Sequence, residues 1–231
     1  MGRFWDARAR EDAFYFVDNV AGYRDGDTER FWAEGERALD TILGLLDLRL
    51  GPRDAVVDIG CGVGRLTRAL AARVVRVDAL DVSAEMLGRA RELNPGLANV
   101  TWHRGDGTSL RPLADASTDA IVSHVVFQHI PDPAITYGYV AEMGRVLRPG
   151  GWAAFQVSDD PGVHAARPGL RARLGALVGR APRGQADPAW LGSAVDLAVL
   201  RETAGEAGLD IERVVGEGTQ FCLVRARRRS G

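Results

Sequence analysis

The sequence contains no lysine, because all 29 of its basic residues are arginine. This absence excludes Schiff-base catalysis and the lysine of a P-loop nucleotide site. Only two cysteines are present, Cys61 and Cys222. The sequence therefore predicts neither a disulfide framework nor a cysteine–histidine metal cluster. The formal net charge is only −2, so nothing in the composition attracts nucleic acid or an anionic membrane.

Long apolar runs are also missing, and the N-terminus lacks a basic segment followed by an apolar one. We therefore expect no membrane segment, no signal peptide and a cytoplasmic location. A hydrophobic content of 46% in 231 residues suffices for one α/β domain with an insertion or a small cap. The exclusive use of arginine also favours a GC-rich bacterial source.

The stretch 56–67 organises the chain as a buried strand, a glycine turn and the start of a helix. β-Branched residues fill the strand, and glycines follow at every second position: Val56, Val57, Ile59, Gly60, Gly62 and Gly64. Such glycines allow positive φ and let a ligand approach the backbone. Asp58 stands at the carboxyl end of the strand, where open α/β sheets bind ligands.

The spacing of this turn is D-x-G-x-G-x-G, whereas a dinucleotide fingerprint reads G-x-G-x-x-G. A carboxylate beside the turn suits a cationic amino group better than a phosphate. This disfavours a Rossmann-type dehydrogenase, which remains an alternative. The stretch resembles the first motif of the class I S-adenosylmethionine-dependent methyltransferases. The resemblance covers residues 54–157 by motif and the last two strands by architecture.

The resemblance implies a Rossmann-like α/β fold. It consists of a seven-stranded, mostly parallel sheet with a terminal antiparallel hairpin and helices on both faces. The chain divides into an N-terminal helical cap (1–50), the cofactor-binding core (51–157), an insertion or lid (158–189) and a last helix with the hairpin (190–231). Strands are expected at 55–59, 74–80, 100–103, 119–124, 152–157, 211–215 and 220–226. Helices are expected at 30–46, 66–72, 134–147, 170–178 and 190–207, the first capped by Asp27 or Thr28. Ser83 is expected to cap a further helix after the second strand, and Ser193 is a candidate cap of the last helix.

The resemblance also implies a set of residues that bind the methionine and ribose parts of S-adenosylmethionine. The loop packs on the methionine part through Asp58, Gly60, Cys61, Gly62 and Gly64. Asp81 follows Gly60 by about twenty residues, where an acidic side chain accepts hydrogen bonds from ribose hydroxyls. Asp78 is the rival for this role, but it falls inside the second strand.

The adenine is expected to meet residues after the second and third strands. Val82 and Met86 flank the ring, although Met86 also suits the core. Asp106, with Gly107 beside it, fills the position that accepts from the adenine amino group. An aspartate in a glycine turn is alternatively a turn former.

Two histidines flank the expected methyl-transfer site, His124 at the tip of the fourth strand and His129 shortly after it. An alcohol acceptor needs a base, and histidine titrates in the right range. His129 is favoured because Asp132, three residues later, is placed to orient its ring; capping of the local turn is the alternative. His103 and His164 are weaker candidates.

No divalent-metal trio is visible, so no metal site is predicted. Mg²⁺ dependence stays open, with Asp132, Asp159 and Asp160 as its candidate ligands.

Acceptor specificity is expected to lie in the N-terminal helices and the insertion. Tyr15, Tyr23 and Arg24 are candidate covers of the pocket, or they only pack the helices on the sheet. The insertion is rich in arginine, which either binds an anionic substrate or keeps the segment soluble: Arg167, Arg171, Arg173, Arg180 and Arg183.

The sequence thus predicts a small-molecule methyltransferase that releases S-adenosylhomocysteine. The expected acceptor is a hydroxyl of a sugar or secondary metabolite, with a histidine base. N- or C-methylation and a non-catalytic cofactor-binding module are the alternatives. No nucleic-acid or membrane partner is expected, and a homodimer is possible.

Overall fold

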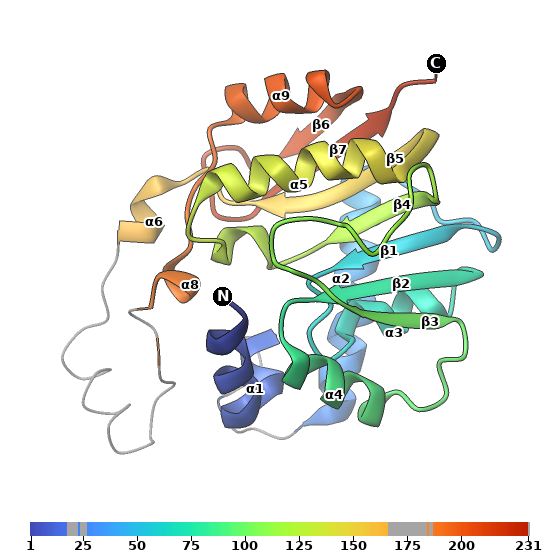
Figure 1. Ribbon diagram of the computed structural model, residues 1–231, viewed down its shortest axis with the longest axis vertical. Coiled ribbons are helices and arrows are strands. Elements are labelled where there is room, and N and C mark those ends of the chain that lie inside the picture. Colours follow the sequence, from blue (N-terminus) through green and yellow to red (C-terminus); the bar gives the residue numbers. More distant parts are fainter. Residues whose placement is uncertain (18–22, 24–26, 166–183, 185–186, 231) are drawn as a thin grey trace.

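The computed structural model describes residues 1–17, 23, 27–165, 184 and 187–230. These residues form one twisted sheet with helices on both faces (Figure 1). The expected helix at 170–178 lies outside the described residues.

The sheet has seven strands in the order β3-β2-β1-β4-β5-β7-β6. Its strands are β1 (Ala55–Ile59), β2 (Arg76–Asp81), β3 (Val100–Arg104), β4 (Thr118–Ser123), β5 (Leu147–Val157), β6 (Leu209–Val215) and β7 (Cys222–Arg228). The first five pair in parallel, and β7 enters antiparallel between β5 and β6. The expected fold class is therefore confirmed. The strand order reverses at β1, so the loops after β1 and β4 lead to helices on opposite faces of the sheet. Open α/β sheets bind ligands in the crevice between such loops.

Alternation along β1 sends neighbouring side chains to opposite faces, and both faces are buried. Val56 packs with α2 (Thr28–Leu45) and α3 (Arg65–Ala71). Val57 packs with α5 (Pro133–Val146) and α9 (Leu197–Glu206). Figure 1 shows α5 and α9 together over one face of the sheet. Helices therefore pack on both faces of β1, and this packing fixes the position of the loop that follows it.

The N-terminal region forms two helices, α1 (Gly2–Val17) and α2. Asp27 is the N-cap of α2, because its carboxylate accepts a hydrogen bond from the backbone N–H of Arg30 at 2.9 Å. α1 lies beside α4 (Ala84–Leu93). Asp6 joins these two helices by accepting from Ser83 Oγ at 2.6 Å and from the Glu85 N–H at 3.1 Å. Ser83 also caps α4, as its sequence position indicates.

The expected helix at 190–207 is wrong, because the chain here forms two helices. These are α8 (Pro188–Leu191) and α9, and they follow the short α6 (Pro161–Ala165). Gly192 has a φ of +64° and packs so closely on the Gln128 carbonyl that no Cβ would fit. Asp196, not Ser193, caps α9 by accepting from the Ala198 N–H. Ser193 instead donates to the Ile130 carbonyl at 2.7 Å.

Every strand after β1 differs from its expected range at one or both ends. The largest difference is in β5, which begins at Leu147 rather than at residue 152. β2 begins at Arg76 rather than at 74, β6 at Leu209 rather than at 211, and β7 at Cys222 rather than at 220. The arginines of the last strand pair across the hairpin with β6: Arg225 and Arg227 both contact Glu212. No helix in the described ranges is long and apolar enough to span a membrane.

Candidate active site

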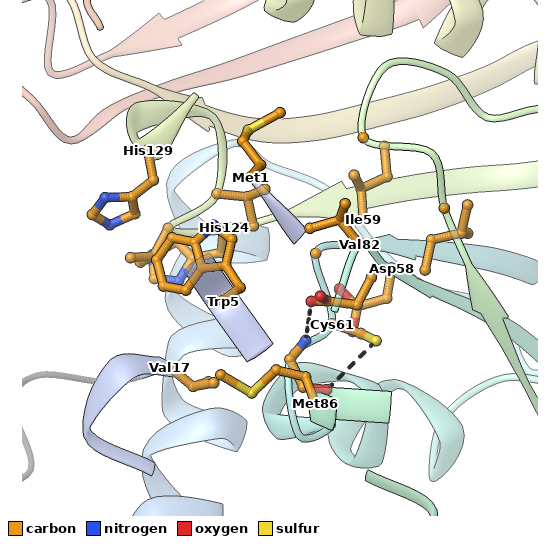
Figure 2. Close-up of a pocket in the computed structure, with 18 of the residues that line it drawn as sticks. Met1, Trp5, Val17, Asp58, Ile59, Cys61, Val82, Met86, His124 and His129 are labelled. Carbon is orange, nitrogen blue, oxygen red and sulfur yellow. Dashed lines mark hydrogen bonds between the residues drawn. The ribbon is translucent and has the colours of Figure 1, made fainter. Parts of the chain in front are cut away.

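A cavity opens at the carboxyl ends of β1, β2 and β4, under the start of α1 (Figure 2). Its empty volume is about 1020 Å³, part of it open to solvent. In the view of Figure 2, Asp58 and Cys61 lie on one side of the cavity, and Trp5, His124 and His129 on the other.

The glycine loop after β1 forms the floor of this cavity. Gly60 and Gly62 have φ values of +73° and +54°. A Cβ on Gly62 would lie 2.6 Å from Cγ2 of Val17, and one on Gly60 would collide with the side chain of Val126. Both positions therefore require glycine. Gly64 has a different role, because it starts α3 against Trp102 and does not line the cavity.

Asp81 ties the loops after β1 and β2 together at the cavity wall. Its Oδ2 accepts from the Gly62 N–H at 2.9 Å, and its Oδ1 accepts from the Ser83 N–H at 2.8 Å. Burial raises the pKa of this carboxyl. Each oxygen has a further lone pair, so the carboxylate can also accept from hydroxyl groups of a ligand. The rival Asp78 points elsewhere and pairs with Arg76 and His103.

Asp58 also lines the cavity, and only 2% of it is exposed. Its Oδ2 accepts from Thr67 Oγ1 at 2.6 Å. Burial raises the pKa of this carboxyl to about 6, although the Thr67 hydroxyl and the Arg65 charge oppose the shift. A buried carboxylate of this kind favours a cationic ligand, which would offset its lost hydration. The neighbouring Cys61 is buried, and burial raises the pKa of its thiol.

Val82, Met86 and Gly107 line the cavity on the α4 side, together with Met1. The carboxylate of Asp106 turns back onto its own loop, where it accepts from the N–H groups of Thr108 and Ser109, both at 2.8 Å. Asp106 is exposed and does not line the cavity. The structure thus shows Asp106 forming its own turn. To contact an adenine, Asp106 would have to use the lone pairs that its own loop leaves open.

His124 follows β4 and lines the cavity beside Arg65. Its Nδ1 lies 3.2 Å from Nη2 of Arg65. A guanidinium only donates, so Nδ1 accepts and the neutral ring carries its proton on Nε2. Burial, followed by the Arg65 charge, lowers the pKa of His124 to about 4. The ring is thus a neutral donor at physiological pH, with its lone pair already engaged.

His129 ends the short helix η1 (Phe127–His129) and also lines the cavity. Its Nδ1 lies 2.9 Å from the Trp190 carbonyl, so Nδ1 carries the proton and Nε2 the lone pair. Nε2 lies 3.3 Å from Nε2 of Gln128, which donates to it. Burial lowers the pKa of His129.

The expectation that Asp132 orients His129 is wrong. The Asp132 carboxylate caps α5 by accepting from the Ala134 N–H at 2.9 Å. The Trp190 carbonyl fixes the ring instead, and Trp190 and Trp5 pack around it at centroid distances of 5.3 and 5.6 Å.

The other histidines and carboxylates have structural contacts. His103 hydrogen-bonds to Asp78 at 2.8 Å, and His164 contacts Ser158 Oγ at 2.7 Å. Asp159 and Asp160 accept from the N–H groups of Gly218 and Gly162, both at 2.9 Å. The described residues contain no group of three or more metal-ligating side chains.

The expected covers of the pocket differ from the observed ones. Tyr15 packs on Phe16 and Tyr23, and the Tyr23 hydroxyl donates to Glu11 at 2.8 Å; neither tyrosine lines the cavity. Arg24 and the five insertion arginines lie outside the described residues. From the described part of the N-terminal region, the cavity is covered by Met1, Trp5, Phe16 and Val17.

The sequence analysis missed Arg65 and Gln128. Arg65 is the first residue of α3, where a positive charge interacts unfavourably with the helix dipole. This unusual position could have indicated a functional role from the sequence. Gln128 is buried, and its amide oxygen accepts from Nε2 of Gln156 on β5. That contact joins residues distant in sequence and gives no local signal.

Comparisons with known proteins agree with this geometry. A family model described as "Methyltransferase domain" matches residues 57–155. A ubiquinone biosynthesis O-methyltransferase from Methylococcus capsulatus is 30% identical over 225 residues, covering 87% of each chain. This chain belongs to the class I S-adenosylmethionine-dependent methyltransferases.

Other members of the family match over shorter stretches or at lower identity. The biotin biosynthesis bifunctional protein BioHC from Cellvibrio japonicus is 37% identical over 139 residues, which are 59% of this chain. The chain spans 24%, 66% and 61% of the lengths of BioHC and two further curated relatives. A methyltransferase structure from Mesorhizobium loti has a TM-score of 0.61 and 24% identity, over 83% of this chain and 96% of that one. The family membership excludes the dehydrogenase alternative.

Proposed function

We propose that this methyltransferase transfers the methyl group to an oxygen atom of a small molecule. The observation that supports binding of S-adenosylmethionine is the Asp81–Gly62 hydrogen bond, which holds an acidic side chain against the glycine loop. The name of the Methylococcus capsulatus relative, an O-methyltransferase, supports oxygen as the acceptor atom.

The described residues fit S-adenosylmethionine. Asp58 supplies a buried negative charge for the cationic methionine end, beside the backbone of Gly60, Cys61 and Gly62. Asp81 would accept from the ribose hydroxyls, and Val82 and Met86 supply apolar surface for the adenine. Gly107 adds backbone at the same end, and Asp106 would add an acceptor only through lone pairs that its own loop leaves open. We assign Gly64 to the geometry of the loop.

The bound cofactor supplies a methyl group on a positively charged sulfur. The protein's own contribution is to hold the acceptor atom in line and to exclude water from it. Trp5 and Ile130 provide apolar lining for this purpose near His129.

A hydroxyl acceptor with a histidine base is one version of this proposal. His129 supports it better than His124, because the Trp190 carbonyl fixes the tautomer whose basic atom is Nε2. The Gln128 amide occupies that atom at 3.3 Å, so the acceptor hydroxyl would have to displace it. Loss of activity in His129→Ala and not in His124→Ala would support this version.

N-methylation is the second candidate chemistry. Arg65 in the cavity wall disfavours a protonated amine beside it, whereas Asp58 and Asp81 favour one elsewhere in the cavity.

The two cysteines are free in the described structure, which agrees with the proposed cytoplasmic compartment.

The test is transfer of labelled methyl from S-adenosylmethionine to small-molecule acceptors, with mass spectrometry of the product. A methyl group on oxygen supports the proposal. A methyl group found only on nitrogen or carbon contradicts it.

A further inference from the structure

Arg65 places a permanent positive charge in the cavity wall. It is 5% exposed and is the only arginine among the described lining residues. α2 packs closely over its stem: a Cβ on Gly35 would lie 2.5 Å from the Arg65 carbonyl oxygen and 2.9 Å from its Cγ. The bare Gly35 therefore keeps the arginine side chain pressed between α2 and the cavity.

His124 adds a second donor beside this charge. Because Nδ1 accepts from Arg65 at 3.2 Å, the ring carries its proton on Nε2. A guanidinium and an imidazole N–H thus stand together in one part of the wall. Such a pair of donors matches an anionic oxygen ligand, and a carboxylate fits the planar guanidinium best.

Neither histidine offers an open lone pair to a hydroxyl. Nδ1 of His124 accepts from Arg65, and Nε2 of His129 accepts from Gln128. An alcohol must lose its proton to a base before or during attack, whereas a carboxyl group is already ionised at neutral pH. A carboxylate nucleophile would therefore need neither histidine as a base.

We propose that the acceptor oxygen belongs to a small carboxylic acid, which Arg65 and His124 hold as its carboxylate. This inference rests on the proposed O-methyltransferase function and names its substrate class. The carboxylate oxygen donates an electron pair to the methyl carbon, and the carbon–sulfur bond breaks with its electron pair remaining on sulfur. The products are a methyl ester and S-adenosylhomocysteine, and no proton is released.

The body of the acid would rest on the apolar side of the cavity. Trp5 and Ile130 line that side, and Trp5 also packs on His129. Figure 2 shows Trp5 and His124 on the side opposite Asp58 and Cys61. Arg65 acts on both groups, because it contacts His124 and its charge also acts on Asp58. Benzoate, cinnamate and hexanoate are suitable probes because each combines a carboxylate with a small apolar body.

The first experiment measures what kind of product forms. The full-length protein is incubated with methyl-tritiated S-adenosylmethionine and each probe acid, with the matching carboxamide and alcohol in parallel. We expect label in the acids only, and its release as volatile methanol by mild alkali, because esters hydrolyse and ethers do not. Label only in the alcohols, stable to alkali, overturns the inference while leaving O-methylation intact.

The second experiment measures binding without turnover. Calorimetry of the protein saturated with S-adenosylhomocysteine compares each acid with its carboxamide, for wild type, Arg65→Gln and Arg65→Lys. Arg65→Gln should weaken acid binding by about 10- to 100-fold, the range for hydrogen bonds to charged groups, and leave carboxamide binding unchanged. Arg65→Lys should recover part of the loss. Equal binding of acids and carboxamides by the wild type overturns the inference.

A matched control is Arg68→Gln, which alters an exposed arginine one turn later on α3. It should leave acid binding unchanged, although it removes the contact of Arg68 with the Trp32 ring.

The alternative is that Arg65 binds the carboxylate of the cofactor itself. In that case Arg65→Gln would weaken S-adenosylhomocysteine but not its decarboxylated analogue, and the inference fails. Failure of S-adenosylhomocysteine to bind the wild type would instead contradict the proposed function.

Discussion

The imidazole Nδ1 of His129 donates a hydrogen bond of 2.9 Å to the backbone carbonyl of Trp190. This bond joins the loop after β4 to α8, which begins at the end of the expected insertion. Trp190 also packs on Trp5 and Phe16 of α1, at centroid distances of 6.5 and 5.5 Å. His129 is thus linked through Trp190 to α1, the helix that covers the cavity.

We expect His129→Ala to lower the free energy of unfolding by about 1–3 kcal/mol, because it leaves the Trp190 carbonyl without its donor. His129→Asn should recover part of this, because an amide N–H can replace the imidazole donor. Chemical denaturation of the three proteins measures the effect. Equal stability of wild type and His129→Ala would show that the bond does not hold α8.

His124 should remain neutral over the whole physiological range. Burial and the adjacent Arg65 lower its pKa to about 4, so its ring gains a proton only under acid conditions. Proton NMR of the histidine ring signals, assigned with His124→Gln, measures the titration. A midpoint between pH 6 and 7 for this ring would contradict the Arg65 contact.

Asp58→Asn should stabilise the ligand-free protein while weakening its binding of the cofactor. Burial raises the pKa of the Asp58 carboxyl from 3.8 to about 6. Above pH 6 the group is ionised in the folded protein, and this shift then costs about 3 kcal/mol of folding free energy. A neutral amide removes that penalty, so the free energy of unfolding should rise by about 1–3 kcal/mol.

The pH dependence gives the sign of this effect. The folded-state pKa is raised, so the penalty is full above about pH 6 and disappears below 3.8, where folded and unfolded chains are both protonated. The stability gap between Asp58→Asn and wild type should therefore shrink as the pH falls from 6 towards 4. A gap that grows in this range would show that Asp58 is stabilised as the anion.

Asp6 should control how long the cofactor stays bound. It accepts from Ser83 Oγ, the main cause of its lowered pKa, and from the Glu85 N–H. These bonds hold α1 against the residues next to Val82. We expect Asp6→Ala to speed cofactor dissociation by about three- to tenfold, in line with the cost of losing a helix cap.

Stopped-flow release of S-adenosylhomocysteine measures this rate. Arg3→Ala, on the exposed side of the same helix, is the matched control and should release at the wild-type rate. Equal rates for Asp6→Ala and wild type would mean that α1 does not limit release.

The first strand, the glycine turn and the helix caps could be predicted because their signals are local, whereas the arrangement of the seven strands followed from the family resemblance. β-Branched strands, a glycine turn and an aspartate N-cap each depend on neighbouring residues, and β1, the loop and Ser83 form where expected. The break at Gly192 was missed because its cause is tertiary: the Gln128 carbonyl leaves no room for a side chain. The partners of His129 were missed for the same reason, since Trp190 lies 61 residues away while the nearby Asp132 caps a helix.

The central claim is that the loop at residues 58–64 and Asp81 bind S-adenosylmethionine. Isothermal titration calorimetry of the purified protein with S-adenosylhomocysteine tests it most directly. We expect one site per chain with a Kd of about 1–100 μM, within the usual range of enzyme affinities for their substrates, and at least tenfold weaker binding to Asp81→Ala. No heat with either S-adenosyl compound, together with measurable binding of a nicotinamide dinucleotide, would contradict the account.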